Sequence, residues 1–441
     1  MMKKMTTPLN PRGTSLRQRH EGPNKKNNDA YDGLEQRKLR RLPRFRMIYL
    51  VVILFLVTLG LSLSTVKSRL RMYYLVGSPK DFCHNCNKTI TSLRTRNATR
   101  LWEQMEQLKE AKCPLLSTHI RQPRRGRKSS KLSKSPPPKA AICAIARNET
   151  AYLDEWFTYH RAVAGFSEIY LFDNSRPDGM ELTNSGRYDN CPGIFIVPWP
   201  MAEEPQMEAY DTCVYMIRER NKKQQQLLGA TTAEQAVAWT AFIDIDEFIV
   251  LKNERETIVD VLRDVVPLPP PLNRLKYKRP APAALSMNWV MFGTANQTKY
   301  RDEPVTKRFQ FKVNGYGDNH VKQILLLDSI RYAGNPHFAF LKQLLSHEFY
   351  TVMSNGTKVA NEFPWIDPAA RNRVVVHHYT IKSVQEYQFK GCHRGRADLH
   401  TSHEAHKTHC NKVGFVGNIH DDTAWKALIK WVPEYGELYN N

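Results

Sequence analysis

From residue 140 onward, apolar and polar positions follow the spacing of short strands that alternate with helices. Apolar runs at residues 140–146, 168–173 and 193–197 have the length and composition of buried strands, and the third run stops at Pro198. Between the first two runs, apolar residues recur at helical spacing until Gly165; they are Leu153, Trp156, Phe157 and Val163. A helical stretch over about residues 207–228 precedes a second helix and then an apolar run within residues 239–250; a later short strand covers residues 374–376.

Strands that alternate with helices at these lengths predict an α/β domain with a mainly parallel central sheet. The globular composition extends from residue 140 to residue 441, which is ample for one large domain. In such sheets, ligand groups gather where the strands end. Polar clusters follow three of the expected strands, namely Arg147-Asn148-Glu149, Asp173-Asn174 and Asp244-Ile245-Asp246. We therefore expect one sheet edge to carry a ligand site.

The segment Trp239-Thr-Ala-Phe-Ile-Asp-Ile-Asp-Glu-Phe-Ile-Val250 carries the most specific chemistry. If it is a strand, Asp244 and Asp246 project to the same face while Ile245 faces the core. Two carboxylates on one face form an oxygen site for Mg²⁺ or Mn²⁺ that leaves positions open for substrate phosphates. The alternative is a solvated strand end, because Asp-x-Asp also occurs by chance.

The N-terminal third of the chain predicts a membrane anchor and a stem. Residues 47–66 contain no charged side chain and have the length of a transmembrane helix. Residues 1–46 are rich in Lys and Arg, so the positive-inside rule leaves them in the cytosol. The long basic segment argues for a type II signal anchor rather than a cleaved signal peptide. Residues 67–139 read as a largely flexible stem with one helix near residues 101–112, and residues 140–441 form the lumenal domain.

Glycosylation acceptors and cysteines agree with a lumenal location. Asn-x-Ser/Thr sequons occur at Asn87, Asn97, Asn148, Asn296 and Asn355. We expect Asn148 to be unglycosylated because its sequon lies inside the predicted site. The eight cysteines suggest disulfides in an oxidising compartment, with Cys191–Cys213 and Cys392–Cys410 plausible from spacing alone. Cys83 and Cys86 have the spacing of half a zinc site, but no second pair follows them, which favours a stem disulfide.

The formal net charge of +22 does not indicate nucleic-acid binding. Much of the excess lies in the cytosolic tail and in a Ser/Pro-rich basic spacer over residues 121–139, which has too few apolar residues to fold. Aromatic residues do not interleave with these basic runs, as single-strand binding would require. We therefore expect a membrane-anchored protein without a nucleic-acid partner.

The order of the polar clusters resembles glycosyltransferase family 92 and neighbouring family-2-like transferases. The matching elements are Ala146-Arg-Asn-Glu149 with Glu155-Trp156, Tyr170-Leu-Phe-Asp-Asn-Ser175, Phe242-Ile-Asp-Ile-Asp-Glu-Phe248, Trp289-Val-Met-Phe-Gly293 with Arg308-Phe309, Lys322 with His337, and His378-Tyr-Thr-Ile-Lys-Ser383 with Lys390 and Arg394-Gly395. The resemblance covers residues 140 to about 400 in order. It implies a GT-A type nucleotide-diphospho-sugar transferase fold.

The resemblance also implies an activity, a cofactor and roles for site residues. The implied reaction moves a hexose, with galactose the first choice, from a UDP-sugar to a glycan acceptor, with Mn²⁺ or another divalent cation and with inversion. Asp246 is the implied direct metal ligand, Asp244 contacts ribose or metal, and His378 completes the metal shell unless it is a buried structural histidine. The remaining implied donor-binding residues are Arg147, Asn148, Glu149 and Asp173 near the uridine, and Lys322, Lys382 and Arg394 near the phosphates.

The general base is open among several residues, because an inverting transfer needs only a carboxylate or imidazole near the acceptor hydroxyl. Glu303, His337 and Asp302 are the candidates, and Glu348 is also chemically eligible.

Two other classes of protein remain as alternatives. The first is a catalytically inactive GT-A domain that binds glycans or acts as a lumenal scaffold, against which the intact Asp244 and Asp246 argue. The second is a phosphoryl or nucleotidyl transferase, but the chain has no Walker-type phosphate loop. The anchor and tail fit a single-pass protein of the Golgi membrane, and a homodimer through the stem remains open.

Overall fold

The structure is a computed structural model in which only some residues are described. These are residues 113–115, 117–124, 137–175, 181–200, 205–228, 236–268, 280–315, 319–342, 349–359, 365–366, 371, 373–394 and 415–439. The anchor at residues 47–66, the stem helix and the second helix expected before the Asp-x-Asp segment lie outside them. No helix of the described part is long and apolar enough to cross a membrane.

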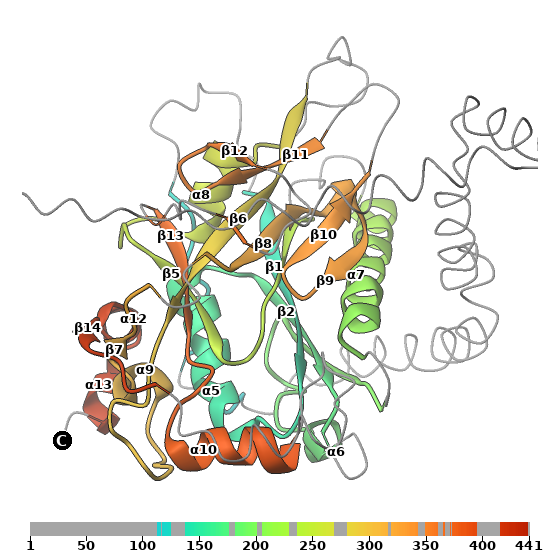
Figure 1. Ribbon diagram of the computed structural model, residues 1–441. Coiled ribbons are helices and arrows are strands. Elements are labelled where there is room, and N and C mark those ends of the chain that lie inside the picture. Colours follow the sequence, from blue (N-terminus) through green and yellow to red (C-terminus); the bar gives the residue numbers. More distant parts are fainter. Residues whose placement is uncertain are drawn as a thin grey trace, which may run out of the picture. The chain divides into compact units, whose positions relative to one another are not determined.

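A ten-stranded sheet forms the centre of the domain (Figure 1). Its main path runs β12-β11-β6-β8-β4-β1-β2-β3, and β13 pairs with both β5 and β6. The strands are β1 Lys139–Ala146, β2 Glu168–Asp173, β3 Ile194–Pro198, β4 Val237–Phe242, β5 Glu247–Leu251, β6 Ala281–Met291, β8 Val321–Leu326, β11 Phe349–Met353, β12 Lys358–Val359 and β13 Val374–His378. The pairs β9 Ile330–Asn335 with β10 Phe338–Leu341, and β7 Phe311–Lys312 with β14 Ile419–His420, form two small sheets.

The prediction of a mainly parallel sheet holds for one half of it. Strands β3, β2, β1 and β4 are parallel neighbours, whereas β8 is antiparallel to both β4 and β6. The expected strands at residues 140–146, 168–173 and 193–197 correspond to β1, β2 and β3. The fold is therefore a mixed α/β domain. The parallel half of its sheet contains the three expected strands.

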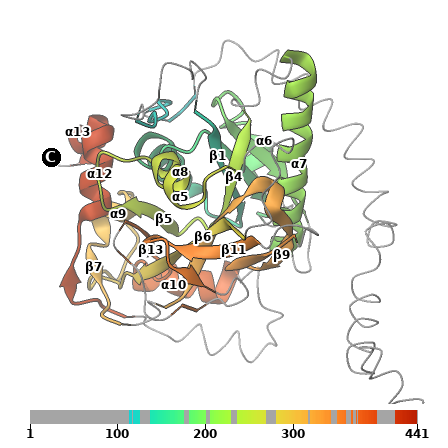
Figure 2. The ribbon, with the colours of Figure 1, turned by 90° about the horizontal axis from the view of Figure 1, so that it is seen from above.

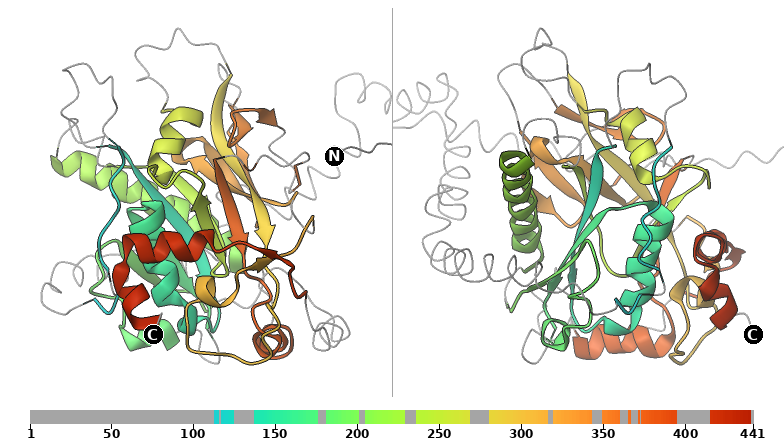
Figure 3. Two further views of the ribbon diagram at one scale, coloured as in Figure 1. Left: turned by 90° about the vertical axis from the view of Figure 1, so that its left-hand side faces the viewer. Right: turned by 180° about the vertical axis from the view of Figure 1, so that it is seen from behind.

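Helices cover both faces of the parallel half. Helix α5, Thr150–Thr158, continues as a π-helical turn over Tyr159–Ala164 until Gly165, and α7 is Pro205–Leu228. Figures 2 and 3 show α5 and α7 on opposite sides of β1 and β2. The other helical segments are α6 Glu181–Ser185, α8 Ile258–Val265, α9 Val305–Arg308, a 3₁₀ turn Leu327–Ser329, α10 Val384–Phe389 with a π-helical turn Lys390–Arg394, α12 Thr423–Trp431 and α13 Pro433–Tyr439. Helix α10 lies across the lower end of the sheet in Figure 1, below α5.

Burial explains why these segments pair. Every residue of β2 is buried, as are all residues of β1 after Lys139, so both strands are covered on two faces, as parallel strands of α/β domains are. The helical face predicted from Leu153, Trp156 and Phe157 is fully buried against this sheet. The apolar periodicity of the sequence therefore corresponds to the core.

Two disulfides differ from the pairing that spacing suggested. Cys191 bonds Cys113, and Cys213 bonds Cys143, so the expected Cys191–Cys213 bond is wrong. The sheet explains the error, because β1 and α7 place Cys143 beside Cys213 although they are 70 residues apart in the chain. Cys392 is also disulfide-bonded, and Cys410 lies outside the described residues.

Candidate active site

The Asp-x-Asp segment is a turn and not a strand. Strand β4 ends at Phe242 and β5 begins at Glu247, with Asp244 and Asp246 between them. The backbone N–H of Glu247 donates to the Asp244 carbonyl at 3.1 Å, and the Asp244 N–H donates to the Glu247 side chain at 2.9 Å. These two hydrogen bonds close the turn. The prediction that Asp244 and Asp246 project to the same face assumed a strand, so it does not apply to this turn.

Asp244 binds a buried lysine from the middle of the sheet. The Lys322 ammonium on β8 is 2.8 Å from one Asp244 oxygen and 3.4 Å from Glu247. The Gln206 side chain donates to the other Asp244 oxygen at 2.8 Å. Burial alone would lower the pKa of Lys322, but the two carboxylates outweigh it and raise that pKa, so the ammonium stays charged. For Glu247, burial raises the pKa, and Lys322 acts in the opposite direction.

Asp246 is buried and contacts two side chains from a later part of the chain, His378 and Lys390. Its Oδ1 lies 3.5 Å from His378 Nε2 at the end of β13, and Lys390 forms an ion pair with Oδ2. Lys390 also donates to Thr380 Oγ1 at 3.0 Å. Although burial disfavours the carboxylate, Lys390 and His378 hold the pKa of Asp246 well below its usual range. Asp246 is therefore a buried anion that two distant segments share.

His378 has the protonation state of a metal ligand. Burial lowers its pKa, which favours the neutral imidazole that coordinates metals. Its other ring nitrogen, Nδ1, is buried and has no hydrogen-bond partner in the described part of the chain. The Trp289 ring packs beside it with centroids 4.2 Å apart.

The pair of Asp246 and His378 fits a divalent cation that substrate oxygens complete. Donor atoms 3.5 Å apart can both lie about 2.1 Å from one ion, the usual bond length for such ligands. Mg²⁺ and similar ions are commonly held by one or two protein ligands and substrate phosphates. Within the described residues no three His, Cys, Asp or Glu side chains form a metal-binding group. Lys322 and Gln206 hold the Asp244 carboxylate, and its expected contact with ribose or metal stays a prediction.

A cavity of about 520 Å³ lies between the start of α5 and α10. Its lining residues come from the segment after β1, from α5 and from the segment after β13: Asn148, Glu149, Ala151, Tyr152, Tyr300, Thr380, Ile381, Lys382, Gln385, Glu386, Gln388, Phe389 and Lys390. Because Lys390 both lines this cavity and binds Asp246, the cavity adjoins the acidic turn. Two of the predicted polar clusters therefore meet here, as expected of a sheet edge.

Lys382 is a strained and desolvated cation in this cavity. Its φ of 56° is unusual for a residue other than glycine. The buried ammonium lies 4.3 Å from the centre of the Tyr152 ring and 4.0 Å from Glu149. Burial lowers its pKa to about 8, while Asp246 acts in the opposite direction. Backbone strain and a buried charge occur together at many binding sites, so Lys382 is a candidate ligand-binding residue.

A buried ion pair fixes the segment that carries these lysines. Arg308, at the end of α9, makes two hydrogen bonds with Glu386 of α10, at 3.1 and 2.6 Å. Glu386 also completes a capping box with Ser383 and accepts a hydrogen bond from Tyr152 at 2.8 Å. Sequence reasoning missed the roles of Tyr152, Glu386 and Lys390, although the Ser383-x-x-Glu386 capping signature was readable.

The predicted uridine-side residues form a connected group at the ends of β1 and β2. Arg147 donates to Asn174 at 2.8 Å, and the N–H of Asn148, whose φ is 53°, donates to Ser175 at 3.3 Å. Asp173 is fully buried, and its oxygens accept from the Ser175 N–H and from both donors of Thr183. Its carboxylate therefore shapes the loop rather than projecting into the cavity.

Of the three candidates for the general base, Asp302 and Glu303 are adjacent in the chain, and His337 lies elsewhere, beside Trp289. Asp302 accepts from Tyr300, which lines the cavity, at 3.2 Å, whereas Glu303 lies 3.7 Å from Lys307. His337 packs against Trp289, hydrogen-bonds the Val321 carbonyl at 3.0 Å, and has its pKa lowered to about 4, chiefly by burial. Glu348 and the side chain of Arg394 lie outside the described part.

Residues 141–312 match the family model of glycosyltransferase family 92, which confirms the resemblance drawn from the motifs. A family 92 protein of Oryza sativa subsp. japonica is 28% identical over 127 residues, covering 28% of this chain and 18% of that protein. A family 92 protein of Ricinus communis is 26% identical over 114 residues, covering 25% of this chain and 17% of that protein. The matched part of the chain thus spans less than a fifth of the length of these relatives.

Among solved structures, the crystal structure of S. aureus TarS 1-349 matches with 8% identity and a TM-score of 0.24. The match covers 68% of this chain and 73% of that one. At that TM-score the likeness carries no argument about function. The family match ends at residue 312, so it does not include Lys322, His378, Lys382 or Lys390.

Proposed function

We propose that the chain is a metal-dependent glycosyltransferase that moves a hexose from a nucleotide sugar to a glycan acceptor. The observation that carries the proposal is the environment of Asp246. This buried carboxylate is shared by His378 and Lys390, and Lys390 opens onto a cavity of about 520 Å³ that Lys382 also lines. A carboxylate–imidazole pair beside two cations suits a ligand that presents both a divalent cation and a diphosphate.

The chain's own residues divide this work between two groups. Asp246 and His378 would hold the cation, which when bound neutralises charge on the leaving diphosphate. Lys382 and Lys390 would hold phosphate oxygens, because a fixed cation stabilises negative charge that grows as the bond breaks. These groups are buried, so water screens their charges less than it does at the surface. Their electrostatic interactions with a bound diphosphate would therefore be stronger.

The finer assignments extend the family resemblance. UDP-galactose is the proposed donor and inversion the proposed outcome, as the resemblance implies. The fold proposed for the domain is the GT-A type, which the parallel strands β3-β2-β1-β4 and the turn after β4 support. Asp302 is the base candidate nearest the cavity, because its partner Tyr300 lines it.

The compartment is part of the proposal. We place the chain in the Golgi membrane as a single-pass type II protein, with residues 47–66 as the anchor. Buried disulfides such as Cys143–Cys213 support an oxidising compartment for the domain. Protease protection of the domain in sealed microsomes tests this topology, and digestion of the domain without detergent would contradict it.

Release of UDP from UDP-galactose by the full-length chain, with and without Mn²⁺, tests the activity. We expect Asp246→Asn to abolish Mn²⁺-dependent release, because it removes the charge that His378 and Lys390 share. Asp264→Asn is the matched control, since that side chain is 64% exposed and pairs only with Arg373 in the described part. Equal release by wild type and Asp246→Asn would refute this site. Binding of glycans without any release would favour the inactive lumenal lectin instead.

A further inference from the structure

A second cavity lies at the other end of the parallel strands. Its volume is about 290 Å³, and its walls include Lys139 at the start of β1 and Glu168 at the start of β2. The first cavity begins at Asn148, just after the far end of β1. The two cavities therefore lie at opposite edges of the sheet, and the second has no part in the proposed transfer.

The side chains that line the second cavity are mostly cationic. Arg121, Lys139, Arg161 and Arg220 line it, and Glu168 is the one carboxylate among the lining residues. Arg220 and Lys139 both pair with this Glu168, the latter at 3.9 Å. A single carboxylate is thus shared by two of the four cations, which leaves an excess of positive charge in the cavity.

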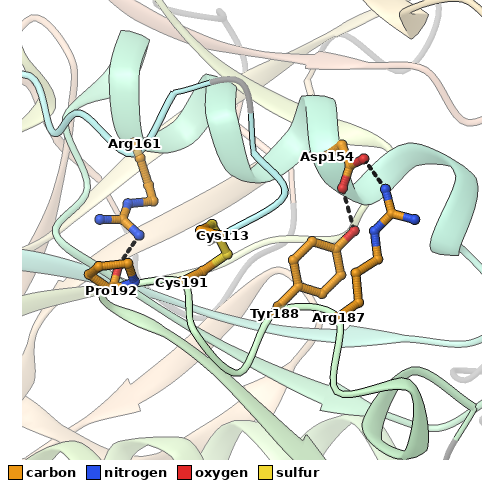
Figure 4. Close-up of a disulfide and its surroundings, with 7 residues drawn as sticks. All are labelled: Cys113, Asp154, Arg161, Arg187, Tyr188, Cys191 and Pro192. Carbon is orange, nitrogen blue, oxygen red and sulfur yellow. Dashed lines mark hydrogen bonds and ion pairs between the residues drawn. A yellow bond between two sulfur atoms is a disulfide. The ribbon is translucent and has the colours of Figure 1, made fainter. Parts of the chain in front are cut away.

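Arg161 is the cation with the poorest compensation. Its side chain is almost fully buried, and its Nη1 donates to the Pro192 carbonyl beside the Cys113–Cys191 disulfide (Figure 4). Its Nε is buried and has no hydrogen-bond partner in the described part of the chain. Burial lowers its pKa to about 10 although Glu168 acts in the opposite direction. A buried charge without a paired anion is costly, so a ligand that supplies one is favoured.

Arg121 is held by neutral groups on the same side. Its guanidinium donates to the carbonyls of Val163, at 2.8 Å, and Glu254, and it stacks on the Trp431 ring at 3.9 Å. The carboxylates of Asp260 and Glu254 lie near enough to favour its charge, and neither residue lines the cavity. These contacts fix the guanidinium in place, and Arg121 adds to the positive charge around the cavity.

We propose that this cavity binds a tetrahedral oxyanion, phosphate or sulfate, either free or as an ester. Planar guanidinium groups with several N–H donors match the oxygens of such anions better than any other side chain does. A volume of 290 Å³ is at the small end of ligand pockets, which suits an anion with at most a small attached group.

Isothermal titration of the full-length chain with inorganic phosphate and with glucose 6-phosphate, at constant ionic strength, tests the proposal. Lys139→Gln and Arg220→Gln should each weaken binding about tenfold or more, as loss of a charge-assisted hydrogen bond does. Glu168→Gln should tighten binding, because it removes the anion that competes with the ligand. A purely structural role of these residues would not produce opposite signs. Tighter binding of glucose 6-phosphate identifies an ester ligand, and tighter binding of phosphate identifies the free ion.

Two controls separate this site from other basic surfaces. Arg187→Gln removes an exposed guanidinium that pairs with Asp154, also drawn in Figure 4, and should leave binding unchanged. Lys390→Gln removes a proposed phosphate contact of the first cavity, so it reports any binding there, whereas the binding that Lys139→Gln and Arg220→Gln weaken should remain. Binding that is lost in Lys390→Gln but kept in Arg220→Gln, or no binding by the wild type, would overturn the proposal. Because transfer activity is not measured, failure of the proposed function has no bearing on the outcome.

Discussion

The Oδ1 atom of Asp246 lies 3.5 Å from Nε2 of His378, although the two residues are far apart in the sequence. The pairing of β5 with β13 brings them together, since His378 is the register partner of Glu247, the residue after Asp246. The backbone N–H of Tyr379 also donates to the Asp246 carbonyl at 2.8 Å. The pairing of β5 with β13 and this hydrogen bond therefore hold the acidic turn and His378 together.

Replacing His378 by alanine should weaken Mn²⁺ activation of UDP release more than it changes the donor affinity. Loss of one of two proposed protein ligands should raise the Mn²⁺ concentration for half-activation by about tenfold or more. His420→Ala is the matched control, because His420 is exposed, hydrogen-bonds Gln310, and has no contact with Asp246 in the described residues. An equal shift in both variants would mean that His378 supports the fold and not the metal.

The buried ion pair between Arg308 and Glu386 should be important for stability. The two side chains are 1% and 6% exposed. Removing one partner from such a pair costs about 3–5 kcal/mol, because the other charge stays buried. We expect Arg308→Gln to lower the free energy of unfolding in urea by that amount.

The exposed pair of Arg187 and Asp154 is the control for this prediction. Arg187→Gln should cost no more than about 1 kcal/mol, the usual contribution of a surface pair. A loss for Arg308→Gln as small as that would show that water reaches Glu386 in solution.

Lys382 should make nucleotide binding depend on pH. Its pKa in the folded protein is lowered to about 8, so the ammonium that would hold a phosphate loses its proton as the pH rises through 8. UDP affinity measured by calorimetry should therefore fall between pH 7 and pH 9. Lys382→Gln should bind UDP more weakly at pH 7 and show little further change, whereas a wild-type affinity independent of pH would refute the role.

The lowered pKa of Lys382 should also make the folding stability depend on pH. Because the folded-state pKa lies below that of a free lysine, the unfolded chain binds more protons between pH 8 and pH 10. The contribution of Lys382 to folding stability should therefore increase with pH in this window. Urea unfolding of wild type and Lys382→Gln at pH 8 and pH 10 measures it, and the difference between the two proteins should change in favour of the wild type.

The sequence predicted the parallel half of the sheet because local periodicity encodes it. Strands β1 and β2 are buried on both faces, and continuous apolar runs report that directly. The turn at Asp244 was missed because it depends on two hydrogen bonds with Glu247, which the apolar pattern of residues 239–250 does not reveal.

The site was only half predictable for a related reason. Asp244, Asp246, His378, Lys322 and Lys382 were expected near a ligand from the order of motifs, but not their contacts. The pairing of Asp246 with Lys390 and of Asp244 with Lys322 arises from strands and helices that pack over long sequence separations. Such contacts leave no local pattern, and the same reason explains the wrong pairing expected for Cys191 and Cys213.

Of the described sequons, Asn355 should carry a glycan and Asn148 should not. Asn355 is exposed in the turn between β11 and β12, whereas Asn148 lines the first cavity with its N–H bonded to Ser175. A glycan at Asn148 would fill the space proposed for the donor. Glycopeptide mapping of the full-length chain from mammalian cells measures both sites, with Asn355→Gln as a control for occupancy. Full occupancy at Asn148 would contradict the proposed donor site.

The disulfide between Cys143 and Cys213 should stabilise the sheet strongly. It joins β1 to α7 across 70 residues of chain, and both cysteines are fully buried. Closing a loop of that length contributes about 4 kcal/mol in the chain-entropy description. The Cys143→Ala/Cys213→Ala double variant should lose that amount in urea unfolding, and each single variant should lose at least as much. Because neither cysteine lines either cavity, the double variant should keep its UDP affinity wherever it remains folded. An unchanged unfolding midpoint would mean that β1 and α7 hold together without the bond.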